Sequence, residues 1–286
     1  MEPESTRDAS TYHPDFDVPD AHAVLRSAEG TLYRVPPFIL RNTTEFFKTP
    51  GLLTPPEDQE DVFIPTSAPD SALERLLRLI CGLPTPPWTS YDELEAVIGL
   101  AQEWRASGPV AFIRCAITAP LFLADPLRLY ALATRLGWVE EQRLAATHTL
   151  RLSIWEPQHQ TLLQSLSAPD LLALLRLHRA RRDEFKRLLD GESIFDAGNA
   201  DLRFCNECGE KLDNRPWREL KARLVSEIDT RPLGEAIGKL EMEEWPEAVL
   251  CWAAKCTKES CGKANYDRVS TLQAITGCLD KLPVTI

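Results

Sequence analysis

The sequence predicts an α+β protein in which a short β-containing segment precedes a long, mainly helical chain. Two apolar runs on either side of Glu29-Gly30 predict a β-hairpin, because glycine adopts the positive φ that a tight turn needs. Helix-start signals then recur before leucine-rich periodic runs, which predicts a series of helices. Two cysteine pairs, each followed by glycine, indicate a metal site in the last third of the chain. With 286 residues, the chain is long enough for two compact units.

Composition and charge restrict the class of partner. The chain is 44% hydrophobic and has a formal net charge of −11. This charge argues against nucleic acid as the main partner, because phosphate binding needs a cationic face. The sequence has no uninterrupted apolar stretch of about 18 residues and no secretory leader, so we expect neither membrane association nor secretion. The expected compartment is the cytoplasm or the nucleus, where the eight cysteines would stay reduced.

The N-terminal segment is expected to become ordered near Val18. Residues 1–16 are polar and aperiodic, which indicates a disordered acidic tail. The hairpin is predicted within residues 23–35, a helix within residues 36–47 and a short strand within residues 61–66. Together with the helices that follow, these elements form a predicted domain at residues 17–125.

Helix-start chemistry repeats along the rest of the chain. The tetrapeptide Ser-Ala-Pro-Asp occurs at residues 67–70 and again at residues 167–170, and in each copy the serine is the predicted N-cap. Ser90 and Glu93 form a further capping box. Prolines at residues 84–87 interrupt the helical pattern. The helices are expected at residues 71–82, 91–106, 109–119, 126–136, 139–151, 168–189, 214–228, 245–255 and 267–280.

Residues 126–192 are predicted to be a helical extension, and residues 193–286 a cysteine-rich region that follows a linker at residues 191–201. The basic run at residues 176–187 is interpreted as a solvated helix face. Cys81 and Cys115 are expected in the core, as are most of the seven tryptophans. Trp88, beside the prolines, is a candidate partner contact, with a packed loop tip as the alternative.

Several residues within 16–125 match a pattern of an extended start, then a strand, then a helix that ends in two phenylalanines. They are Pro19-Asp20-Ala21, Val24-Leu25, Tyr33, Val35, Ile39-Leu40 and Phe46-Phe47. With this pattern the segment resembles the BTB/POZ domain, especially the version found in a large fungal family. Residues 126–190 resemble the helical extension of the same proteins, and the paired cysteines also suit them. Two positions depart from the family, since His22 replaces a usual aspartate and Pro36 a frequent histidine.

The resemblance implies a protein-interaction module that binds another copy of itself. In that family the dimer interface uses the first helix and the N-terminal strand, which gives the candidate residues Val18, Val24, Phe38, Ile39 and Phe46. Some BTB proteins are adaptors of cullin-type ubiquitin ligases and carry a hydrophobic-x-Glu element after the first helix. Here Pro55-Pro-Glu57 has that spacing with proline in place of the hydrophobic anchor, so a cullin adaptor is an alternative function. A transcriptional regulator with a cysteine finger is a third, although the C-terminal segment is net acidic.

The cysteine pairs predict a structural zinc site. Cys205 and Cys208 are two residues apart, Cys256 and Cys261 are four apart, and Gly209 and Gly262 follow directly. Four thiolates form a closed tetrahedral site that contributes folding energy and has no open position for a substrate. Cys251 is an alternative to Cys256 as a ligand, and buried reduced thiols are the alternative to a metal site. Because no catalytic motif is present, we expect a protein that is not an enzyme.

Overall fold

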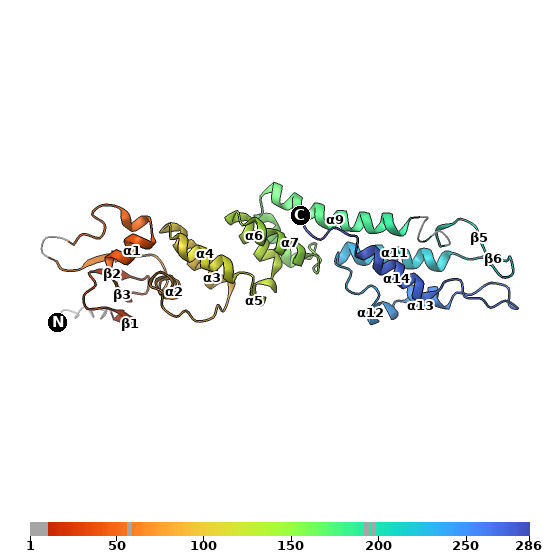
Figure 1. Cartoon of the computed structure of the whole chain (residues 1–286), viewed down its shortest axis with the longest axis horizontal. Coiled ribbons are helices and arrows are strands. Elements are labelled where there is room, and N and C mark those ends of the chain that lie inside the picture. Colours follow the sequence, from red (N-terminus) through yellow and green to blue (C-terminus); the bar gives the residue numbers. More distant parts are fainter. Residues whose placement is uncertain (1–10, 56–58, 192–194, 196–197) are drawn as a thin grey trace, which may run out of the picture. The chain divides into compact units, whose positions relative to one another are not determined.

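The computed structural model describes residues 11–55, 59–191, 195 and 198–286 (Figure 1). Residues 1–10 of the expected tail lie outside this range. The described chain is α+β, as predicted, with many helices and a small mixed sheet. It divides into two compact units, Met1–Ala124 and Asp125–Ile286. Among the described helices, none is both long and apolar enough to cross a membrane.

The first unit is built on a four-stranded sheet with the order β1-β3-β2-β4. The predicted hairpin pairs β2 with β3 in antiparallel orientation, and Leu25 faces Tyr33 across the pair. Its turn contains Gly30 at a φ of +96°. The outer strands β1 and β4 pair in parallel with β3 and β2. The strands are β1 Tyr12–Asp17, β2 Ala23–Arg26, β3 Leu32–Val35 and β4 Val62–Pro65.

Strand β1 corrects the prediction that order begins near Val18. The ring of His13 stacks on Tyr33 with 5.1 Å between centroids, and Phe16 is buried. Arg34 on β3 donates a hydrogen bond of 2.9 Å to the hydroxyl of Tyr12. These contacts come from residues about twenty positions later in the chain, so the local composition of β1 gives no sign of them.

Helices complete the first unit, and the start of one of them differs from the expected capping. Ser90 accepts a hydrogen bond of 3.2 Å from the backbone N–H of Glu93, which confirms the predicted N-cap of α3. Ser67 does not cap α2, because that helix begins at Asp70 with Pro69 at its N-cap position. The backbone N–H of Asp70 instead donates to the Glu29 carboxylate in the β2–β3 turn, at 2.8 Å. The helices are α1 Pro37–Thr43, the 3-10 helix Phe46–Lys48, α2 Asp70–Cys81, α3 Tyr91–Glu103, α4 Ser107–Ala116 and α5 Pro120–Leu123.

The proline-rich loop between α2 and α3 is fixed by Arg75. This buried guanidinium donates to the carbonyl oxygens of Pro86 and Pro87 and pairs with Glu93. It also lies over the ring of Trp88, 4.6 Å from the centroid. Trp88 is half-buried, so its geometry is that of a packed loop tip.

The second unit is helical apart from one short hairpin. Helix α9 starts with Ser167 as its N-cap, as predicted, because the serine accepts from the N–H of Asp170. Helices α9 and α11 contribute to a core around Phe185, Trp217 and Leu220. The elements are α6 Pro126–Leu136, α7 Val139–Thr149, the 3-10 helix Pro157–His159, α8 Gln160–Ser165, α9 Ala168–Leu189, β5 Arg203–Phe204, β6 Lys211–Leu212, α11 Arg215–Thr230, α12 Leu240–Glu243, α13 Pro246–Ala253 and α14 Arg268–Leu279.

Much of the expected linker is packed where the structure describes it, although Asp201 at its end is exposed. Phe195 is buried and stacks on Trp217 at 5.0 Å. Asn199 donates to the carbonyl oxygen of Leu189 and accepts from the indole N–H of Trp217. A Cβ at Gly198 would lie 2.7 Å from that indole, so the close approach requires glycine. Residues 192–194 and 196–197 of the segment lie outside the described residues.

The basic run on α9 is also less solvated than expected. Arg181 is buried and donates hydrogen bonds of 2.7 Å to the carbonyl oxygens of Pro232 and Pro283. His178 is buried as well, with Nε2 3.0 Å from the hydroxyl of Thr149. Burial and the nearby Arg181 charge lower the pKa of His178 to about 4. The imidazole is therefore neutral in the folded protein at neutral pH.

His178 should make folding stability depend on pH. The unfolded chain binds a proton at this imidazole near pH 6.5 and the folded chain only near pH 4, so stability is fully present above pH 6.5 and falls as the pH drops towards 4. We expect this group to remove about 2 kcal/mol between pH 7.5 and pH 5. Urea unfolding at both pH values measures the loss. His178→Gln should reduce it and His22→Gln, at an exposed site, should not; equal losses in all three proteins would contradict the assignment.

Candidate metal centre

Two backbone hairpins of the second unit carry the cysteine pairs. In the first, β5 and β6 flank Cys205 and Cys208, and the N–H of Cys205 donates to the carbonyl oxygen of Glu210 at 2.8 Å. In the second, Lys255 and Ala264 form an isolated bridge around the other pair, and the N–H of Cys256 donates to the carbonyl oxygen of Lys263 at 2.7 Å. In both hairpins, the backbone N–H of the first cysteine thus bonds to the carbonyl oxygen of the residue two positions after the second cysteine, although the spacing within the two pairs differs.

The glycine after each pair has a backbone role. Gly209 has a φ of +71° and Gly262 a φ of +59°. No atom lies within 4 Å of a Cβ added at either position. Since space is available, it is the left-handed backbone conformation that favours glycine at these turns.

The four sulfur atoms of Cys205, Cys208, Cys256 and Cys261 all lie within 4.8 Å of one another. The Sγ atoms of Cys205 and Cys261 are 3.7 Å apart, and those of Cys208 and Cys256 are 3.5 Å apart. These distances far exceed the roughly 2.05 Å of a disulfide. They approach the sulfur–sulfur edge of about 3.8 Å that follows from four sulfurs at about 2.3 Å from a tetrahedral ion. The arrangement therefore fits a four-coordinate metal.

Each sulfur accepts a hydrogen bond from the backbone N–H two residues later in the chain. The donors are Glu207 for Cys205, Glu210 for Cys208, Lys258 for Cys256 and Lys263 for Cys261. Such donors stabilise thiolates and orient them as ligands. The repeated pattern means that both hairpins present their sulfurs by the same turn geometry.

The thiols influence one another's ionisation. The N–H groups of Glu207 and Cys208 lower the pKa of Cys205 to about 7. The N–H of Glu210 lowers the pKa of Cys208, yet burial and the hydrogen bonds to Cys256 and Cys205 leave it raised. Four thiolates cannot gather in one place without a cation, because each negative charge disfavours the next. A bound metal ion relieves this repulsion.

The side chains of the two hairpins carry a net positive charge, which is opposite in sign to the charge of four thiolates with a divalent ion bound. Four thiolates around a divalent ion carry a net charge of −2, and the two hairpin segments carry five basic side chains against three acidic ones. Lys263 and Glu207 also form an ion pair of 2.7 Å between the hairpins. The basic residues are Arg203, Lys211, Lys255, Lys258 and Lys263, and the acidic ones are Glu207, Glu210 and Glu259.

Cys251 is not part of this cluster. It is buried in the helical core with Cys278, and burial raises the pKa of Cys251 to about 12. The structure thus brings Cys256, and not Cys251, to the other three sulfurs. The apolar cluster at the four cysteines is small, since among the described residues Leu212 is the one buried member besides cysteines.

The described residues include one other group with metal-ligating side chains, formed by His13, Asp15 and Glu74. Arg78 pairs with both carboxylates there. Its positive charge already compensates them, so this group is an ion-pair cluster of the first unit.

The predicted partner-binding residues have different environments. Val18, Phe38 and Phe46 are exposed, and Ile39 is half-buried. Val24 is fully buried within the sheet, so it contributes to the core and cannot contact a partner directly.

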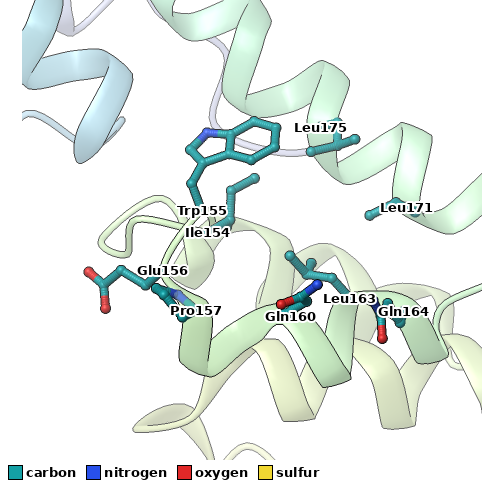
Figure 2. A pocket seen from close by; sticks show the side chains of 9 residues that line it. All are labelled: Ile154, Trp155, Glu156, Pro157, Gln160, Leu163, Gln164, Leu171 and Leu175. Atoms are coloured by element: carbon teal, nitrogen blue, oxygen red, sulfur yellow. The ribbon is translucent and has the colours of Figure 1, made fainter.

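Three expectations about buried residues need correction. Cys115 is exposed, although its helical pattern predicted a core residue, and Cys81 is half-buried. Trp155 is 67% exposed, whereas most of the tryptophans are expected in the core. It lines an apolar groove together with residues of the preceding loop, the 3-10 helix, α8 and α9 (Figure 2), and no local signal marks the tryptophan as exposed.

In comparisons with known proteins, no family model and no curated protein matches the sequence.

The geometry gives a test of the ligand set. Cys256→Ser should abolish stoichiometric metal binding because it removes one of four ligands, whereas Cys251→Ala should retain it. Elemental analysis of each purified variant measures the metal-to-protein ratio. Cys115→Ser, at an exposed thiol remote from the cluster in sequence, is the control for nonspecific thiol binding. Loss of metal from Cys251→Ala with retention in Cys256→Ser would reverse the assignment.

Proposed function

We propose that this chain is a non-catalytic protein-interaction module whose first unit is BTB/POZ-like and self-associates, and whose second unit is stabilised by a structural zinc ion. The order of elements in the first unit supports this proposal. A hairpin is followed by a helix, a short strand and a helical hairpin, which is the order that the resemblance implies. The eight free cysteines fit a reducing compartment such as the cytoplasm or nucleus.

The observation that carries the proposed binding activity is the exposure of large apolar side chains on the first unit. Phe38 on α1 is 63% exposed, Val18 is 41% exposed and Phe46 is 39% exposed. Burying such side chains against a second copy removes apolar surface from water. A two-fold interface would use the same residues on both copies.

Zinc is the metal that best suits the four-sulfur cluster. Tetrahedral sites of four soft thiolates select zinc or an iron–sulfur centre, and the closed zinc form is a structural site. Structural zinc contributes about 10–16 kcal/mol of apparent binding energy near neutral pH. This contribution matters here because the sulfur cluster has little apolar packing of its own.

The cullin-adaptor alternative has less support. Leu53, the apolar residue nearest to the expected cullin element, is 5% exposed and therefore belongs to the core. Residues 56–58, which include the rest of Pro55-Pro-Glu57, lie outside the described residues.

Zinc binding is tested by metal content and local protection. We expect about one zinc per chain, and Cys205→Ser with Cys208→Ser should release it. Hydrogen exchange should then accelerate in residues 203–212 and 255–264, because the two hairpins lose their link, while α9 and α11 keep the protection of their own core. Folded protein with intact thiols and no metal would refute the site, and iron in place of zinc would refute the choice of metal.

Self-association is tested by light scattering over a concentration series. Phe38→Asp with Phe46→Asp should lower the average mass at a given concentration, because two buried carboxylates oppose the contact. Phe112→Asp is the matched control, since Phe112 is 51% exposed on α4 of the same unit and lies outside the proposed surface. A wild-type chain that is strictly monomeric at tens of micromolar, or a mass unaffected by the double change, would rule the interface out.

A further inference from the structure

Two close sulfur–sulfur contacts of the four-cysteine cluster join one hairpin to the other. The Sγ atoms of Cys205 and Cys261 are 3.7 Å apart, and those of Cys208 and Cys256 are 3.5 Å apart. We call these two contacts the cross-hairpin pairs. Because a disulfide bond is about 2.05 Å long, each pair would close if its sulfurs approached by about 1.5 Å. The present arrangement is therefore close to that of two disulfides that link the hairpins.

Two further contacts align the hairpins without involving a sulfur. Lys263 pairs with Glu207 at 2.7 Å. The hydroxyl of Thr257 donates to the carbonyl oxygen of Lys211 at 3.2 Å. Since neither contact depends on the cysteines, both favour the same alignment of the hairpins while the sulfurs change partner.

Each cross-hairpin pair combines one accessible and one buried cysteine. Cys208 and Cys261 are half-buried, so solvent reaches one member of each pair. Their partners Cys256 and Cys205 are buried, with exposed fractions of 7% and 5%. Thiols that respond to oxidants have this arrangement, in which an accessible sulfur meets the oxidant and a neighbouring cysteine then forms the disulfide.

We propose that the four-cysteine cluster is a redox switch, in which hydrogen peroxide converts the two cross-hairpin pairs into disulfides and thereby releases the metal ion. The proposal rests on the structural zinc site proposed above and adds its regulation. The bonds formed are Cys205–Cys261 and Cys208–Cys256.

Each disulfide forms in two steps that consume one peroxide. The accessible thiolate sulfur attacks a peroxide oxygen, so an S–O bond forms, the O–O bond breaks, and the leaving hydroxide takes a proton from solvent to become water. The partner thiolate then attacks the oxidised sulfur, so the S–S bond forms, the S–O bond breaks, and a second hydroxide leaves and is protonated. Two electrons pass from the two sulfurs to the peroxide.

Oxidation of both pairs removes every thiolate from the site. Metal binding requires deprotonated thiols, and a disulfide sulfur carries no negative charge, so the ion loses all four ligands. The five basic and three acidic side chains of the hairpins balance the charge of −2 of the loaded site and carry an uncompensated charge of +2 after oxidation. The switch thus changes the local charge while the hairpins stay joined. A thiol reductant reverses it by disulfide exchange.

Metal release is measured on the full zinc-loaded chain. Two molar equivalents of hydrogen peroxide should release about one zinc per chain, which a chromogenic chelator records, and dithiothreitol followed by added zinc should restore binding. Cys115→Ser is the matched control, because it removes an exposed thiol outside the cluster and should leave the release unchanged. Zinc that stays bound at about tenfold excess of peroxide would overturn the proposal and leave the metal site standing.

Peptide mapping of the oxidised chain identifies the disulfides. Cleavage after lysine, arginine and glutamate separates all four cysteines, because Glu207 divides the first pair and Lys258 the second. After the remaining thiols are blocked, mass spectrometry should find peptides linked in the two cross-hairpin pairs. Disulfides within each hairpin would overturn the proposal, since they would leave the hairpins unlinked. A reduced, folded chain that carries no metal from the start would refute the metal site and this proposal with it.

Discussion

The four clustered sulfur atoms, which lie within 4.8 Å of one another, join two hairpins of the second unit that are far apart in the sequence. The pairs are separated by the 47 residues between Cys208 and Cys256, a stretch that contains α11, α12 and α13. Each hairpin orients its sulfurs with backbone N–H groups from two residues further along. Because neither hairpin has a substantial core, the position of one depends on the other through the shared site.

The helical core beside this site is held by different forces. Trp217 is fully buried in it and contacts Phe195, while Arg223 lies over the ring of Trp245 at 4.2 Å. Arg181 binds two backbone carbonyl groups that come from distant parts of the chain. A buried guanidinium is costly unless its donors are satisfied, so these bonds fix the segments at Pro232 and Pro283 against α9. The unit thus combines apolar packing at one cluster with ligand geometry at another.

The sequence predicted features set by local chemistry and missed those set by distant contacts. The two Ser-Ala-Pro-Asp segments show the difference, because Ser167 caps α9 whereas Ser67 does not cap α2. At α2 the backbone N–H of Asp70 instead bonds to Glu29 in the β2–β3 turn, and nothing within the tetrapeptide indicates this contact. The cluster of four cysteines was predictable because spacing and a following glycine determine a turn. Choosing Cys256 over Cys251 required the fold, which places one thiol beside a hairpin and the other in the core. The exposure of Trp155 likewise depends on how α8 and α9 lie together.

The four-cysteine cluster and the exposed face of α13, which includes Val249 and Leu250, are physically connected. Trp245, at the N-cap of α13, is buried in the helical core, and the chain leaves the other end of the helix through Ala254 to reach Cys256. The N–H of Asn265 donates to the carbonyl oxygen of Ala254 at 2.9 Å, which joins that end to the second hairpin. The helix is therefore held at both ends, and the orientation of Val249 and Leu250 depends on both attachments. The second hairpin carries two of the four clustered cysteines, so the proposed metal ion would fix this second attachment.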